Sequence, residues 1–156
     1  MLSKIRDTMD RMLAVIVSAL LTILLFTVVW QVFSRYILKD PSSYTDELAR
    51  YLLIWVALLG AAYATGQKLH LAIDLLQSKV QSIWLNRIIY GLIGLFALLI
   101  LVIGGWRLVS ITLSLEQISA ALQIPLGYIY LVLPLSGVVI LVYAILEIIK
   151  PKSSET

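Results

Sequence analysis

The chain has 156 residues, of which 61% are hydrophobic and 13% charged, and it carries a net charge of +3 and no cysteine. Soluble domains hold about 25% charged residues, so this composition excludes an ordinary soluble protein. The missing cysteines exclude disulfides and thiolate metal sites. The basic residues lie at the ends of apolar segments and form no patch, so the positive charge does not indicate nucleic-acid binding.

Four long segments contain no Lys, Arg, Asp or Glu, and they cover residues 12–34, 51–67, 88–106 and 117–146. A helix that crosses the apolar part of a bilayer needs about 17–25 mostly apolar residues. One globular core of this size could not bury four such segments. The sequence therefore predicts an all-α membrane protein with four transmembrane helices, in a single domain over residues 1–150.

The first two spans are expected at about 11–37 and 45–66. The N-terminus is amphipathic at helical spacing and leads into an apolar segment that is too long for a signal-peptide core. Between the spans, Pro41 keeps Asp40 out of helical geometry, so a turn is predicted there. Acidic residues then suit the positive N-terminus of the second helix.

Residues 68–84 follow a different pattern, because apolar residues recur every three or four positions between polar ones. This segment is too polar to span, and we predict a surface-lying amphipathic helix between helices two and three. The third and fourth spans are expected at about 85–115 and 126–149. Pro125 precedes the first turn of the fourth helix, and Pro134 should kink it. Residues 151–156 are expected to form a polar tail.

The distribution of Lys and Arg predicts the orientation in the membrane. Eight of the 12 lie in the N-terminal segment, between the second and third spans, and in the tail. Cytoplasmic segments carry an excess of Lys and Arg. We therefore expect a multi-pass protein of the bacterial inner membrane with both termini in the cytoplasm.

The most informative charged residues are Arg35, Asp46, Glu47 and Arg50, at the junction of the first two spans. A charge at the centre of a spanning helix costs about 2.5–3.5 kcal/mol. Near the interface the cost is lower, yet two arginines beside two carboxylates indicate pairing. The group could be a proton relay, an anion site, or a clamp in which Arg35 holds the acids of the second helix. The clamp is favoured, since no second polar layer continues inward.

Three further positions are candidates for structural or interface roles. His70 and Asp74 stand four residues apart and could pair, but they cannot assemble a metal site, which needs three or four ligands. We expect them on a solvated or interface-facing surface. Small residues around Gly60 allow close helix approach, either within the four helices or against a partner.

No enzymatic site is expected on this chain. It has one His and no Cys, and it lacks the phosphate-binding pattern GxxxxGK[ST]. A nucleophile placed by a base and a third group is not evident. The chain also shows no internal repeat, such as those from which many secondary transporters are built.

Several short motifs follow one another along nearly the whole chain. They are Trp30–Tyr36 (WQVFSRY), Tyr44–Arg50 (YTDELAR), Leu59–Ala62 (LGAA), His70–Asp74 (HLAID) and Ile124–Tyr128 (IPLGY), with Tyr130 and Pro134. In this order they resemble the small membrane subunit of tripartite ATP-independent periplasmic (TRAP) transporters. One departure is Tyr44, where the family often has Trp.

The resemblance implies a scaffold that pairs with a large membrane subunit. A periplasmic binding protein would deliver an organic anion, a sialic acid or a C4-dicarboxylate, with sialic acid favoured. Sodium-coupled translocation would take place in the large subunit, so neither sodium nor another cofactor is expected on this chain. Membrane lipids are the other expected partners. The alternatives are a small integral-membrane enzyme and a small self-assembling exporter.

Overall fold

The computed structural model describes residues 2–40, 42–67 and 83–149, and these are almost entirely helical. The elements are α1 (Leu2–Phe33), the π-helical η1 (Ser34–Leu38), α2 (Ser43–Gly66), α4 (Ile83–Phe96), the π-helical η2 (Ala97–Gly104), α5 (Gly105–Ser114), α6 (Leu126–Tyr130) and α7 (Val132–Ile149). Within the described ranges the only β-type pairing is an isolated bridge between Ile118 and Pro125.

Four helical runs are long and apolar enough to cross a membrane: Arg6–Leu38, Ser43–Gly66, Arg87–Ser114 and Leu126–Ile149. The prediction of an all-helical protein with four such helices is confirmed. Most of the predicted surface helix, residues 68–82, lies outside the described residues, and α4 begins directly after it at Ile83.

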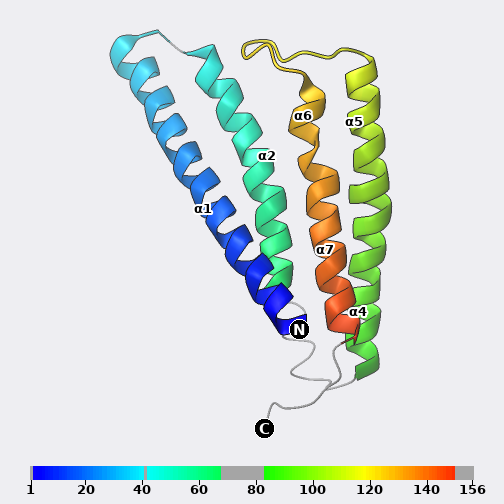
Figure 1. Ribbon diagram of the computed structural model, residues 1–156. Coiled ribbons are helices and arrows are strands. Elements are labelled where there is room, and N and C mark those ends of the chain that lie inside the picture. The colour runs from blue at the N-terminus through cyan, green and yellow to red at the C-terminus, as the bar shows by residue number, and fades with distance from the viewer. Residues whose placement is uncertain (1, 41, 68–82, 150–156) are drawn as a thin grey trace.

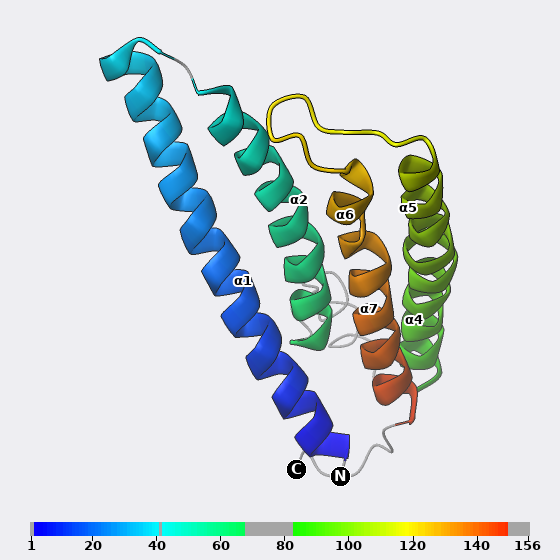
Figure 2. The same ribbon diagram turned by 45° about the horizontal axis from the view of Figure 1, so that its top comes forward.

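The four runs stand side by side in a row (Figure 1, Figure 2). Runs that follow one another along the chain point in opposite directions, so the neighbouring second and fourth runs are parallel. Helix α1 packs on α2, α2 packs on α7, and α7 packs on α4 and η2. The row order differs from the chain order, because the last run lies between the second and the third (Figure 2). As a result α1 and α5 lie at opposite edges of the row.

Helix α7 is the centre of the packing. Within its most apolar stretch, 44% of the residues are buried, against 11% for the first run. One apolar cluster joins α7 to α1 and α2 through Leu13, Leu59 and Tyr143. A second cluster joins it to α2 and η2 through Leu101 and Ile140. The exposed side of α7 is apolar as well, with Leu135, Val138 and Ile145 about half exposed, as expected for a helix that also faces lipid.

The fourth run is interrupted near its start. Pro125 has extended backbone angles (φ −61°, ψ 124°), and α6 begins directly after it. The regular helical hydrogen-bond pattern is interrupted at Leu131, between α6 and α7, although Leu131 keeps right-handed helical angles (φ −57°, ψ −23°). Pro134 has no N–H to donate to the carbonyl of residue 130, one turn earlier, which accounts for the break just before it. At this break the indole Nε1 of Trp55 donates to the carbonyl of Ile129 at 3.1 Å.

The small residues of α2 do not form one continuous packing face. Ala62 is fully buried, and a Cβ on Gly66 would lie 2.6 Å from the ring of Tyr143. By contrast, a Cβ on Gly60 would meet nothing within 4 Å. One side of α2 therefore packs within the row, while the side that carries Gly60 has no close neighbour in the described parts of the chain.

Candidate functional site

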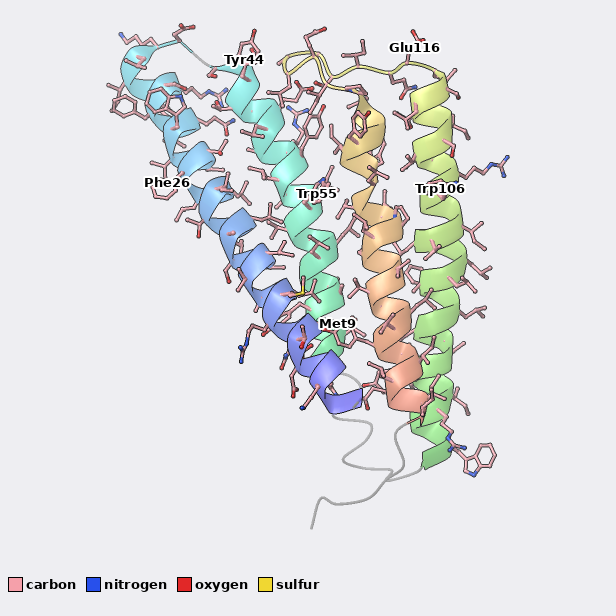
Figure 3. The ribbon with its side chains drawn as sticks, in the orientation of Figure 1. Met9, Phe26, Tyr44, Trp55, Trp106 and Glu116 are labelled. Atoms are coloured by element: carbon pink, nitrogen blue, oxygen red, sulfur yellow. The ribbon has the colours of Figure 1, made fainter. Side chains whose placement is uncertain are left out.

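A polar cleft of ≈ 420 Å³ lies at the end of the molecule where the first run leads into α2. We call it the loop-end cleft, and it is lined by Gln31, Arg35, Ser42, Ser43, Asp46, Glu47, Arg50, Ala120 and Ala121. Figure 3 shows Tyr44 at this end of the bundle and Met9 toward the opposite end. Three segments meet at the cleft: the end of the first run, the start of α2, and the loop between α5 and α6.

Asp46 connects the first run to α2. Its Oδ1 accepts a hydrogen bond from Nε2 of Gln31 at 2.6 Å. Its Oδ2 pairs with the guanidinium of Arg50, one turn further along the same helix. The pair is largely exposed, because 72% of the Arg50 side chain and 47% of the Asp46 side chain are accessible. Such i, i+4 pairs contribute only about 0.3–0.5 kcal/mol.

The predicted clamp between Arg35 and these acids is not formed. Arg35 lies in η1, its side chain is exposed, and among the described residues it makes no ion pair. Asp46 is instead neutralised by Arg50, which is closer because four residues separate the two on one helix face. The link between the first two runs is made by the neutral Gln31.

Glu47 anchors the loop between α5 and α6. Its two carboxylate oxygens accept hydrogen bonds from the backbone N–H groups of Ala120 (3.1 Å), Ala121 (2.7 Å) and Leu122 (2.8 Å). The hydroxyl of Tyr51 also donates to Glu47 at 2.6 Å. Hydrogen bonds to a charged acceptor are stronger than neutral ones. A single carboxylate on α2 therefore holds a loop more than 70 residues away in the sequence.

The loop is shaped to present these N–H groups. The N–H of Ser119 donates to the carbonyl of Ile124 at 2.9 Å, and the N–H of Leu126 donates to the carbonyl of Gln117 at 2.9 Å. Glu116 and Gln123 have positive φ angles of 48° and 55°, which turn the chain at both ends of the segment that faces Glu47. Pro125 belongs to this closure through its bridge with Ile118.

A second polar group lies at the opposite end of the row, and we call it the basal cluster: Arg6, Asp10, Gly66, Tyr143 and Glu147. Arg6 Nη1 lies 2.6 Å from Glu147 Oε1, and Arg6 Nη2 donates to the carbonyl of Gly66. Arg6 Nε lies 3.9 Å from Asp10 Oδ2, and the Tyr143 hydroxyl donates to Asp10. The cluster therefore connects α1, the end of α2 and the end of α7.

The basal cluster is more buried than the loop-end cleft. Only 7% of the Glu147 side chain and 22% of the Arg6 side chain are exposed. Among the described residues, no buried side-chain nitrogen or oxygen lacks a hydrogen-bond partner. A charge is tolerated at such a place only when it is paired and hydrogen-bonded, so we interpret the cluster as a structural connection.

Sequence analysis did not identify the basal cluster. The sequence held one indication of it. Glu147 directly follows a charge-free segment of 30 residues, and a carboxylate at that place needs a cation nearby. Its partner Arg6 is 141 residues away. The order of helices in the row decides which basic residue reaches it, and the sequence does not state that order.

The remaining predicted positions divide into two groups. His70 and Asp74 lie outside the described residues. Gly60 is on the side of α2 without close neighbours, Pro125 closes the loop, and Pro134 packs against Gly105. Within the described ranges, no three His, Cys, Asp or Glu residues stand close enough to hold a metal ion.

The chemistry open to the loop-end cleft follows from its hydrogen bonds. Glu47 is saturated by backbone and hydroxyl donors, and Asp46 is shared between Gln31 and Arg50. The Glu47 carboxylate therefore has no free position for a substrate group. The exposed guanidinium of Arg35 retains donor capacity for an anion.

Comparisons with known proteins agree with one another. The family model for tripartite ATP-independent periplasmic transporters, DctQ component, matches residues 24–151. A Haemophilus influenzae protein named as a TRAP transporter small permease protein is 27% identical over 130 residues, which cover 82% of this chain and 78% of the relative. The sialic acid TRAP transporter small permease protein SiaQ of Vibrio cholerae is 34% identical over 80 residues, which cover 51% of this chain and 44% of the relative.

Proposed function

This chain belongs to the DctQ component family of tripartite ATP-independent periplasmic transporters, and we propose that it acts as a membrane-fixed scaffold for a large membrane subunit. As a small permease component with four membrane-length helices, it is a multi-pass inner-membrane protein. The observation that carries the proposal is the family match, which extends over most of the four runs. Membership of this family implies a large membrane subunit and a periplasmic binding protein as partners.

The interior of the row supports a scaffold role over a transport path. The two packed clusters between the helices are made of apolar side chains, including Leu59, Val132 and Ile140. The ion pairs of the described residues lie at the two ends, in the loop-end cleft and the basal cluster. Ionisable residues inside a membrane normally mark routes for ions and substrates, so we place the route in the large subunit.

We propose that the complete transporter couples sodium entry to uptake of an organic anion. Sialic acid is the favoured substrate, because the similar Vibrio cholerae protein SiaQ is named for a sialic acid transporter. A C4-dicarboxylate is the alternative. In this proposal, sodium and substrate bind the large subunit and the periplasmic protein, and this chain holds neither.

The test of the scaffold is association with the large subunit. Co-expression with the large subunit of the same transporter should yield a stable one-to-one complex after purification in mild detergent. A matched preparation with an unrelated multi-pass protein serves as the control. Recovery of the two subunits separately, in detergents that preserve each of them, would contradict the scaffold role.

We further propose that both termini face the cytoplasm and that the loop-end cleft faces the periplasm. The absence of cysteine in the chain allows single cysteines to be introduced at Ser3, Ser42, Ser78 and Ser153. A membrane-impermeant thiol reagent applied from the periplasm should label only the cysteine at position 42. Labelling at position 3 or 153 from that side would reverse the orientation.

A further inference from the structure

One arginine lies within a membrane-length run and has no ion-pair partner among the described residues. Arg107 stands seven residues before the end of the run Arg87–Ser114, about 10 Å at the rise of an α-helix. Apolar side chains continue past it, because Leu108, Ile111 and Leu115 are 41%, 46% and 62% exposed. The Arg107 side chain is itself exposed. Ionisable residues within spans are normally paired, so the partner of this guanidinium should come from outside the chain.

Arg107 faces away from the helices of its own chain. The buried side of α5 carries Gly105 and Val109, and a Cβ on Gly105 would lie 2.8 Å from the Leu133 side chain. Two residues correspond to about 200° around a helix, so Arg107 lies on the side opposite Gly105. Helix α5 also stands at the edge of the row (Figure 2). The guanidinium is therefore outside the apolar clusters and forms no path between the helices.

The same side of α5 carries two exposed serines. Ser110 and Ser114 follow Arg107 by three and seven positions, which places the three residues on one helix face, and we call them the α5 strip. Ser110 donates to the carbonyl of Trp106 at 3.0 Å, and Ser114 donates to the carbonyl of Ile111 at 2.8 Å. Each hydroxyl oxygen keeps the capacity to accept. Serine is also small enough to let helices approach closely in a membrane.

We propose that a transmembrane helix of the large subunit docks on the α5 strip and pairs one of its carboxylates with Arg107. The proposal rests on the scaffold function and adds the face of the chain that forms the contact. A carboxylate suits the site, because the planar guanidinium binds carboxylates at two points. Ile103 and Ile111, which are 56% and 46% exposed on either side of Arg107, would pack against the same helix.

Charge decides against a second copy of this chain as the occupant. A two-fold pair of chains brings the same patch of each together. Contact through the α5 strip would then bring the two Arg107 side chains together, and like charges in such surroundings repel. The remaining candidate is a lipid phosphate, which would need no protein partner. A crosslinking experiment separates it from a helix of the large subunit.

Photocrosslinking locates the docking face. p-Benzoyl-phenylalanine is introduced at Ile111, beside the α5 strip, or at Ile23, which is similarly exposed (49%) on α1 at the other edge of the row. The full-length chain is co-expressed with the large subunit of the same transporter and irradiated in native membranes. Position 111 should give about tenfold more crosslinked one-to-one product than position 23. Equal product from the two positions, or crosslinks from position 111 to lipid alone, would overturn the proposal.

Variants test the charge. Arg107→Gln should lower the amount of large subunit that co-purifies by about tenfold, as expected for the loss of a charge-assisted hydrogen bond. Arg107→Lys keeps the charge without the planar fork and should give an intermediate amount. Arg11→Gln is the matched control, since Arg11 is exposed on α1. Wild-type recovery with Arg107→Gln, or an equal loss with Arg11→Gln, would refute the role of Arg107.

The outcomes also separate this proposal from the scaffold function on which it rests. If the wild-type chain co-purifies with the large subunit while position 111 gives no crosslink to it, the scaffold stands and the docking face is refuted. If the wild-type chain does not co-purify with the large subunit, the scaffold fails and the docking face fails with it. Thermal unfolding of the isolated Arg107→Gln chain should match that of the wild type, because the side chain is exposed and makes no ion pair among the described residues.

Discussion

The two polar ends of this molecule use the same residue types for different purposes. In the basal cluster, Arg6 and Glu147 are 22% and 7% exposed and bond across α1 and α7. In the loop-end cleft, Arg50 and Asp46 are 72% and 47% exposed and pair along one helix. A largely buried pair connects two helices firmly, because separating its partners leaves a charge without compensation. Exposed pairs contribute little to stability and leave donors and acceptors available to a ligand.

The largest effect is expected from breaking the basal ion pair. Glu147→Ala removes the nearer of the two carboxylates beside Arg6, while Asp10 stays 3.9 Å away, and should reduce the free energy of unfolding by up to about 3–5 kcal/mol. Denaturant unfolding in detergent micelles measures this change. Asp7→Ala, on an exposed turn of the same α1 segment, should change it by less than about 0.5 kcal/mol. Similar losses of unfolding free energy in Glu147→Ala and Asp7→Ala would show that the basal ion pair does not stabilise the chain more than an exposed residue does.

A smaller effect is expected from crowding the basal cluster. A Cβ on Gly66 would lie 2.6 Å and 2.8 Å from two ring carbons of Tyr143, so Gly66→Ala should destabilise the chain by about 1–3 kcal/mol. Gly60→Ala, on the open side of the same helix, should stabilise the isolated chain by up to about 1 kcal/mol, since Ala favours helices. Thermal unfolding of both variants checks the opposite signs. Changes of the same sign would show that the two glycines have similar surroundings.

At the loop-end cleft the largest response should come from Glu47. Glu47→Gln replaces one acceptor oxygen by an amide nitrogen that cannot accept from the loop, so at least one of the hydrogen bonds that hold the loop is lost. Hydrogen exchange at the amides of residues 120–122 should become about tenfold faster. Glu116→Gln alters an exposed acid of the same loop and should leave exchange unchanged. Unaltered exchange in Glu47→Gln would show that the loop is held by other contacts.

The smallest effect is expected from the exposed pair. Arg50→Ala should cost about 0.3–0.5 kcal/mol of unfolding free energy. Arg35→Ala, which removes no ion pair among the described residues, should cost still less. Unfolding of the two variants side by side measures the difference. A loss above about 2 kcal/mol in Arg35→Ala would restore the clamp that the sequence suggested and that the structure does not contain.

The helices were predictable from the sequence because their cause is local. Charge-free segments of membrane length predict spans directly, and the breaks near Pro41 and Pro125 follow from the backbone of proline. The pairing of Asp46 with Arg50 could also have been predicted from the sequence, since four residues separate them on one helix. The clamp prediction was wrong because it gave weight to the distant Arg35 over this local neighbour.

Two features could not be derived in this way. The contact between Arg6 and Glu147 depends on α7 lying beside α2, and that order follows from the packing of all four runs. The anchoring of the loop by Glu47 depends on backbone N–H groups of Ala120, Ala121 and Leu122. Every residue carries such a group, so no side-chain pattern marks those that converge on one carboxylate.

The central claim is that this chain supports transport without performing it, and reconstituted transport tests that claim most directly. Proteoliposomes would contain this chain alone, the large subunit alone, or both, with the loaded binding protein and a sodium gradient outside. We predict uptake of the labelled organic anion only when both subunits are present, and its loss when sodium is replaced by potassium. Uptake by this chain alone, or full uptake by the large subunit alone, would contradict the scaffold role.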